Sequence, residues 1–76
     1  MKTITVNGEK HTLELFRERD VETGMVIGQR YGRRVYRVLC FDGDEVIARS
    51  VRNAGIIVAM PVEEVLDEFG FVTDWS

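Results

Sequence analysis

The 76 residues of this chain make one domain, and a chain this short buries only about 60% of the surface that its unfolded form exposes, so we expect a thin core and no deep substrate cavity. Its 45% hydrophobic and 30% charged residues are ordinary for a soluble folded protein, and its single cysteine excludes an intrachain disulfide. No run approaches the ~18 apolar residues of a membrane span and the first residues carry no apolar signal segment, so we expect a cytoplasmic protein.

Charge is segregated along the chain. Residues 30–52 hold six of the eight arginines against three acidic residues, whereas residues 53–76 hold five acidic residues and no basic one, within a net charge of −3. A molecule with this distribution can attract a charged partner, and it can equally pair its own two ends.

The dipeptide Asn7-Gly8 predicts a hairpin between strands at residues 3–6 and 10–15, because both residues accept the positive φ of a type I′ turn. A two-residue loop sets Val6 opposite Glu9. It also sets Ile4 opposite His11. This register gathers the apolar side chains on one face: Ile4, Val6, Leu13 and Leu15.

The middle of the chain predicts a short strand and a longer hairpin. Residues 16–23 are polar and predict a loop. Residues 25–30 predict a short strand, in which Gly28 indicates a bulge or a sharp bend. Residues 35–41 and 45–51 predict the central hairpin, because both runs are rich in β-branched and aromatic residues.

The turn of the central hairpin, Asp42-Gly43-Asp44, fits both a two-residue loop and a longer bulged one. A last strand is expected at residues 56–60. Core positions are expected on these strands at Leu39, Val46 or Ile47, and Ile57.

A short helix is predicted over residues 61–69, because Pro61 suits the first helical position and an apolar stripe recurs at helical spacing. Gly70 is expected to act as a left-handed C-cap. Residues 71–75 are expected to form a short extended tail, with Trp75 packed against the domain.

These five or six short strands, tight turns and one small helix indicate a mainly β protein. Four segments carry a resemblance to a known family: ETGMVI at residues 22–27, YRVL at 36–39, DGD at 42–44 and IVAMPVEE at 57–64. Their order over residues 22–69 resembles that of small SH3-like β-barrel domains, including bacterial and phage domains whose final strand runs into a short helical turn. The resemblance implies a single antiparallel SH3-like barrel over residues 1–76, with the hairpin 3–15 and the helix 61–69. It also implies binding to proteins, peptides or nucleic acids, among which the fold alone does not choose.

Residues that could support catalysis or bind a metal are few. One histidine and one cysteine cannot supply a four-ligand zinc site, and residues 42–45 lack the spacing of a calcium loop, so no metal or cofactor is expected. Cys40 lies in an apolar strand and is expected to be a small buried hydrophobe. His11, its only possible histidine partner, belongs to the other hairpin and is expected at its rim, so no catalytic residues are expected.

The acidic residues of the helix are interpreted as its solvated face, and not as an acid cluster or a DNA-mimicking surface: Glu63, Glu64, Asp67 and Glu68.

The candidate binding residues lie around the central hairpin: Arg30, Tyr31, Arg33, Arg34, Arg37, Arg49 and Arg52. Arginine beside tyrosine can hold phosphate and stack on bases. Against a nucleic acid stands the sequence pI of about 5.0, the opposite of the usual signature. The competing interpretation is that these arginines are solvated or neutralise the acidic C-terminal third.

Together these patterns favour a non-catalytic small binding module or inhibitor that engages a protein partner, of the phage or bacterial accessory type. The alternative is a nucleic-acid-binding domain that uses the arginine-rich hairpin 30–52. A small enzyme subunit is a weaker alternative. No membrane partner is expected, and an unpaired edge strand would allow a homodimer.

Overall fold

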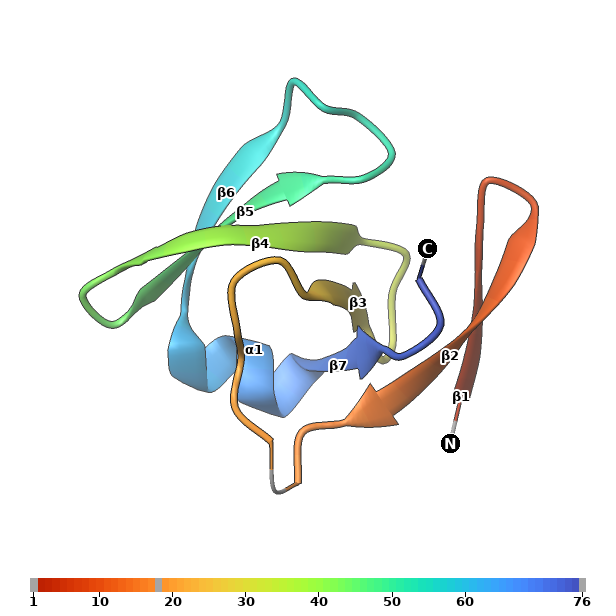
Figure 1. Ribbon diagram of the computed structural model, residues 1–76, viewed down its shortest axis with the longest axis horizontal. Helices are drawn as coiled ribbons and strands as arrows, with labels where there is room; N and C mark the ends of the chain where they lie inside the picture. The colour runs from red at the N-terminus through yellow and green to blue at the C-terminus, as the bar shows by residue number, and fades with distance from the viewer. Residues whose placement is uncertain (1, 18, 76) are drawn as a thin grey trace.

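The computed structural model describes residues 2–17 and 19–75, which form one antiparallel sheet of seven strands and one short helix (Figure 1). The elements in chain order are β1 (Lys2–Val6), β2 (Glu9–Leu15), β3 (Val26–Gln29), β4 (Val35–Asp42), β5 (Glu45–Ser50), β6 (Ile57–Pro61), α1 (Val62–Glu68) and β7 (Phe69–Val72). The predicted mainly β class is confirmed, with seven strands in place of the expected five or six.

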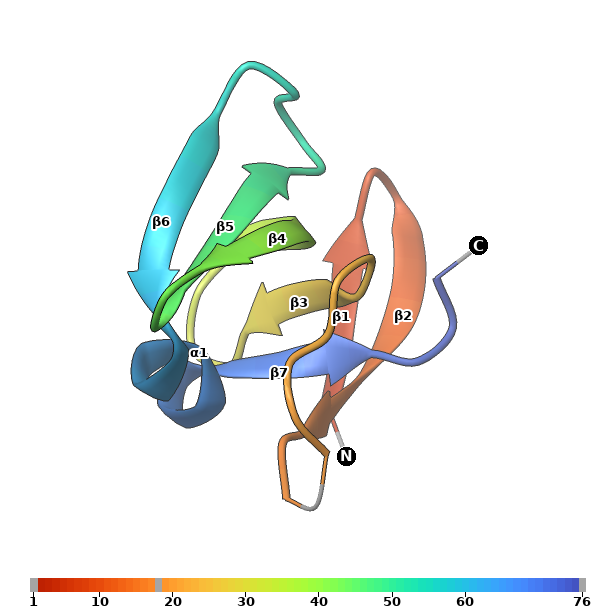
Figure 2. The same cartoon turned by 60° about the vertical axis from the view of Figure 1, so that its left-hand side comes forward.

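The strands lie side by side in the order β1-β2-β7-β3-β4-β5-β6, and every neighbouring pair is antiparallel. The sheet is curled, so that β6 and the β1–β2 hairpin stand on opposite sides of β3 and β4 (Figure 2). Within residues 2–17 and 19–75 no ladder joins the end strands β1 and β6, so closure into a barrel stays a prediction.

The first hairpin forms as predicted. Asn7 and Gly8 have φ angles of 51° and 83°, as a type I′ turn requires, and they set Val6 opposite Glu9. The register buries Val6 and Leu13 on the same face, as the apolar pattern indicated.

The β4–β5 hairpin also closes through a two-residue loop, which decides between the two turns that the sequence allowed. Asp42 pairs with Glu45, and Gly43 supplies the positive φ of 60°. The ladder slips at a bulge between Val38 and Cys40. The bulge sets Cys40 opposite Ile47, whose side chain points away from the face of its buried neighbour Ala48. Cys40 is therefore exposed, and its predicted burial is wrong.

Apolar side chains are buried on both faces of the sheet, in two clusters. The α1-side cluster is Val21, Ile27, Tyr36, Val38, Val46, Ala48, Met60, Val65 and Phe69, and the hairpin-side cluster is Val6, Leu13, Val26, Val35 and Val72. Successive residues of β3 and β4 alternate between the two clusters, because neighbouring side chains of a strand point to opposite faces. These two strands are therefore covered on both sides.

Of the expected core positions, Val46 is fully buried, whereas Leu39 and Ile47 are half-buried. Ile57 is 53% exposed, so its predicted burial is wrong. It pairs with the exposed Arg49 and lies on the edge strand β6, turned away from the α1-side cluster.

The predicted helix is confirmed as α1, whose solvent-facing acidic residues are exposed as expected. Pro61 is its N-cap residue and not its first helical residue. The helix α1 is the only one in the described residues. Its seven residues are far fewer than the ~20 that a helix needs to span a bilayer.

The predicted C-cap at Gly70 and the extended tail from residue 71 are wrong. Phe69 to Val72 form β7, which lies in the middle of the sheet between β2 and β3. Gly70 is not among the described residues with positive φ. A Cβ atom there would lie 2.5 Å from the carbonyl oxygen of Glu14, so glycine is needed for a close approach of two strands.

Two isoleucines test the core assignment. Ile27→Ala should lower the free energy of unfolding by about 2–5 kcal/mol, because Ile27 is fully buried on β3. Ile57→Ala, the matched control on β6, should change it by no more than about 0.5 kcal/mol. Urea unfolding of both variants measures the difference, and equal losses would contradict the burial described above.

The packing of β7 is tested at two glycines. Gly70→Ala should destabilise the protein by about 1–3 kcal/mol, because the new methyl group meets backbone that cannot move aside. Gly55→Ala is the control, since its Cβ would meet only the Asn53 side chain, at 3.4 Å. Thermal melting should separate the two variants clearly. A Gly70→Ala protein that melts with wild type would refute the close approach of β7 and β2.

Candidate functional site

The β3–β4 turn, residues 30–34, carries three of the candidate arginines, and two hydrogen bonds between Gln29 and Arg34 hold it in shape. The amide of Gln29 donates to the carbonyl oxygen of Arg34 at 2.9 Å, and the amide of Arg34 donates to Oε1 of Gln29 at 3.1 Å. The Gln29 side chain occupies the space beside Gly32. Arg33 and Arg34 are consequently left exposed on the outside of the turn.

The loop after β5 places a third arginine. The hydroxyl oxygen of Ser50 accepts the amides of Arg52 and Asn53, each at 3.2 Å, which fixes the backbone around Arg52. From there Nη2 of Arg52 donates to the carbonyl oxygen of Thr5, on β1, at 3.1 Å. Arg52 therefore links this loop to the edge strand of the sheet.

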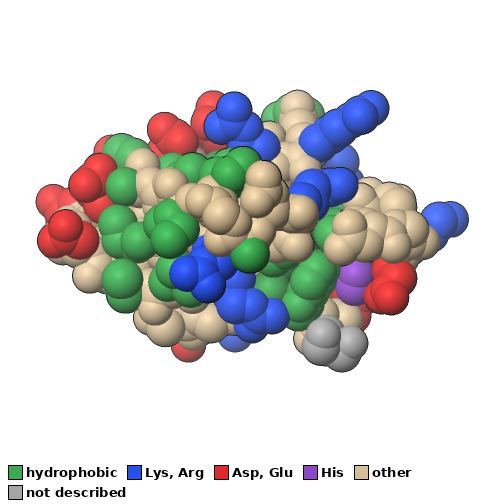
Figure 3. Space-filling model, turned by 90° about the horizontal axis from the view of Figure 1, so that it is seen from above, with side chains coloured by type: hydrophobic (Ala, Val, Ile, Leu, Met, Phe, Trp, Pro, Cys, Tyr) green, Lys and Arg blue, Asp and Glu red, His purple; other side chains and the backbone are tan. Residues whose placement is uncertain are grey.

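Two adjoining hollows lie between these elements. The edge hollow, of about 410 Å³, is lined by residues 2–5 of β1, by the β3–β4 turn and by Arg52. The second, called here the Ile56 hollow, has about 500 Å³ and is lined by both loops and by apolar side chains of β4 and β6. The hollows share Arg33, Val35 and Arg52. On one face of the molecule, basic side chains gather in the middle with hydrophobic ones exposed between them (Figure 3).

The other candidate residues do not line these two hollows. Arg37 and Arg49 face each other across β4 and β5, and Nη1 of Arg37 donates to the carbonyl oxygen of Gly24 at 3.1 Å. Arg30 is half-buried, and its Nε atom has no partner among the described residues. Tyr31 is 93% exposed, and the Lys2 ammonium group lies 5.0 Å from its ring centroid.

The structure thus brings together Arg33, Arg34 and Arg52 out of the seven candidates, and it adds one residue that the sequence analysis missed. Lys2 lines the edge hollow beside Arg33. No sequence pattern indicated it, because β1 and the β3–β4 turn are far apart in the sequence and line one hollow only in the folded chain. Within residues 2–17 and 19–75, none of the arginines at 30–52 forms an ion pair with a carboxylate, so neutralisation by the acidic C-terminal third is not observed.

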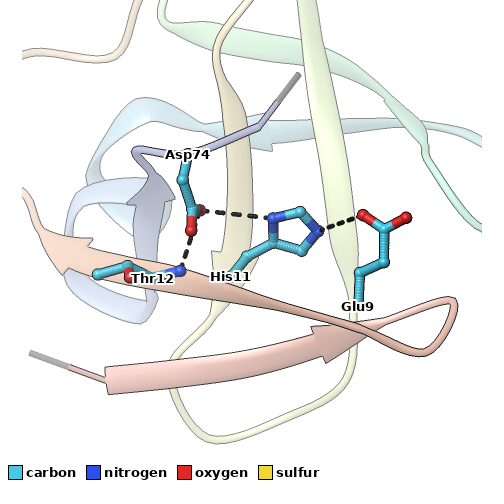
Figure 4. A network of polar contacts seen from close by, with 4 residues as sticks. All are labelled: Glu9, His11, Thr12 and Asp74. Atoms are coloured by element: carbon cyan, nitrogen blue, oxygen red, sulfur yellow. Dashed lines mark hydrogen bonds and ion pairs between the residues drawn. The ribbon is translucent and has the colours of Figure 1, made fainter.

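A polar cluster on β2 surrounds the single histidine (Figure 4). Oδ1 of Asp74 accepts the amide of Thr12 at 3.0 Å and lies 3.4 Å from Nδ1 of His11, while Oε2 of Glu9 lies 3.8 Å from Nε2. His11 is only 7% exposed, so its predicted place at the rim is wrong. The ring centroids of His11 and Trp75 are 4.7 Å apart, which confirms the prediction that Trp75 packs against the domain.

This cluster fastens the end of the chain to β2. The amide of Thr73 also donates to the carbonyl oxygen of Thr12, at 3.2 Å, so backbone and side chains of residues 73–75 together hold β2. In the part of the chain that the structure describes, no group of three or more His, Cys, Asp or Glu side chains is arranged to hold a metal ion. The hydrogen bonds to Thr12 and the contact between the rings of His11 and Trp75 give the cluster a structural role.

Comparison of the chain with protein-family models, with curated proteins and with solved structures gave no match. The candidate site is accordingly defined by geometry and chemistry. Its three arginines offer planar guanidinium groups that bind carboxylates or phosphates through two parallel hydrogen bonds.

The Arg37–Arg49 pair gives a test of this electrostatic description. Arg49→Glu should raise the free energy of unfolding by about 0.2–1 kcal/mol, because it replaces two like charges on directly opposed residues with an attractive pair. The gain should shrink at high salt, since both side chains are exposed. Arg33→Glu, on the turn, should change stability by no more than about 0.5 kcal/mol. Thermal melts at low and high salt measure both, and a less stable Arg49→Glu protein would refute the pairing.

Proposed function

We propose that this protein is a non-catalytic binding module that engages a protein partner through the surface around Arg33, Arg34 and Arg52. The observation that carries this proposal is the pair of adjoining hollows that share two of these arginines. One hollow exposes the edge of a strand, and the other exposes apolar side chains. Protein partners need that combination, because they present backbone, apolar groups and charge together.

The Ile56 hollow supports a protein partner in particular. Ile56 is 46% exposed and lies beside Val58 and the two shared arginines. Apolar contact combined with arginine is typical of the residues that dominate protein–protein binding energy. The edge strand β6 runs directly into α1, as a strand runs into a short helical turn in some of the SH3-like domains that the segments of residues 22–69 resemble, and such domains mostly act by binding.

The proposal includes a cytoplasmic module of the phage or bacterial accessory type. The exposed thiol of Cys40 supports a reducing compartment, because an exposed free thiol is prone to oxidation elsewhere.

Nucleic acid is the second candidate partner, favoured by one observation. Arg37 and Arg49 form an exposed like-charge pair, and a bound phosphate would relieve their repulsion. The pI of about 5.0 and the net charge of −3 weigh against it, since nucleic-acid binders carry a dominant basic surface.

Two probes separate these functions: a display library of short random peptides, and mixed DNA and RNA oligonucleotides at low salt. Wild type should retain peptides from the library, and Arg33→Glu/Arg34→Glu should lose them, because the substitution reverses the charge of the shared surface. Arg37→Glu/Arg49→Glu, at two residues outside both hollows, is the charge-matched control and should retain them. Retention of oligonucleotides that falls steeply with salt, without peptide enrichment, would establish the nucleic-acid function instead.

A further inference from the structure

We propose that the partner contributes an extended acidic segment, which pairs as an additional strand with the free edge of β1 and places a carboxylate on Arg52. This inference rests on the proposed function and names the kind of partner segment that would bind in the edge hollow. Strand addition to an exposed sheet edge is a recurring mode of peptide recognition, in which the backbone supplies affinity and alternate side chains supply specificity.

The register of the first hairpin determines which groups β1 offers. In an antiparallel pair closed by a two-residue loop, Val6 and Glu9 exchange both backbone hydrogen bonds, and pairs alternate from there. The amides and carbonyls of Thr3 and Thr5 therefore point away from β2. Thr12, opposite Thr3, confirms this alternation, because its own amide and carbonyl bond outward to Asp74 and Thr73.

Arg52 covers part of this edge through a single hydrogen bond, which a bound strand could replace. Its guanidinium group donates a hydrogen bond to the carbonyl oxygen of Thr5, which is one of the backbone groups that point away from β2. Such a contact is one way in which a protein blunts an exposed edge. An incoming strand would donate an amide to that oxygen, and the released guanidinium could then bind a carboxylate of the same strand through two hydrogen bonds.

The charge around the edge selects an acidic occupant. The edge hollow is lined by Lys2, Arg33 and Arg52 and by no acidic residue among the described part of the chain. A second copy joined through β1 would bring two such basic sets together, which like-charge repulsion opposes. A phosphate backbone only accepts hydrogen bonds, so it would leave the carbonyl groups of Thr3 and Thr5 unmatched.

The first experiment is an N-methyl scan. The peptide most strongly retained by wild type in the display selection is synthesised as a set, each member with one methylated backbone amide. Methylation of every second amide should weaken binding about five- to tenfold, because those amides donate to β1, and methylation of the amides between them should change little. This alternation with a period of two is the signature of strand pairing, which a helical or side-chain-only complex would lack.

The second experiment changes the protein. Thr3→Pro removes one outward amide without removing a bond to β2, so it should weaken the same peptide about five- to tenfold, with Thr3→Val as the matched control that keeps the amide. Arg52→Glu should weaken it about tenfold or more, and replacing the facing glutamate or aspartate of the peptide with lysine should restore binding. Thermal melts of each variant show that the fold is intact.

The outcomes distinguish this inference from the proposed function. Peptides that need Arg33 and Arg34 but show no alternation in the scan would overturn strand pairing and leave the protein-binding function standing. No retained peptide at all would overturn both. Self-association of the free protein that Thr3→Pro abolishes would show that a second copy, and not an acidic partner, takes the edge.

Discussion

Three backbones meet at the Gly28–Gly70 pair, and the rest of the structure depends on this close approach. Gly70 lies opposite Gly28 on β3 and Leu15 on β2, and a Cβ atom at Gly70 would strike the backbone of Glu14. A Cβ atom at Gly28 would come within 3.0 Å of Cδ1 of Ile4, on β1. Without side chains at these two positions, β7 can enter the middle of the sheet and the first hairpin can lie across β3. The edge hollow exists because β1 is held in that place.

Local signals predicted the elements that are closed by local geometry. Asn7-Gly8 and Gly43 each supply the positive φ that a two-residue hairpin loop requires, and Pro61 precedes a helix that lies within the predicted range. The errors arise where pairing joins distant segments. Four residues after a helix carry no signal that they belong between β2 and β3, so Gly70 was assigned to a cap when its role is to let strands approach. The bulge after Val38 also has no signal in the sequence. It turns the side chain of Cys40 to the face opposite to that of Val38.

The candidate site could be predicted in composition but not in arrangement. Sequence analysis selected the arginines around the central hairpin, among which Arg37 lies opposite Val26 and on the same face of β4 as Val35. Which of these arginines line the edge hollow depends on β1, which lies outside that segment. Lys2 and the outward backbone of Thr3 and Thr5 reach Arg33 and Arg52 only through the fold of the first hairpin. The charge pattern of the sequence therefore selected more arginines than line the two hollows, and it gave no sign that β1 lines one of them.

The segregation of charge would orient an acidic segment as it approaches the edge hollow. The helix α1 lies away from the β1–β2 hairpin (Figure 1). The acidic residues of α1 are exposed, whereas the edge hollow is lined by β1 and by basic residues. An acidic segment would be repelled at the first surface and attracted at the second, so the field of the molecule would orient an encounter before any contact forms. A protein with an overall charge of −3 can therefore attract an acidic partner, provided that the attraction is confined to one edge. The same arrangement disfavours promiscuous binding, because long polyanions such as nucleic acids would also meet the acidic end, whereas a short strand on β1 would not.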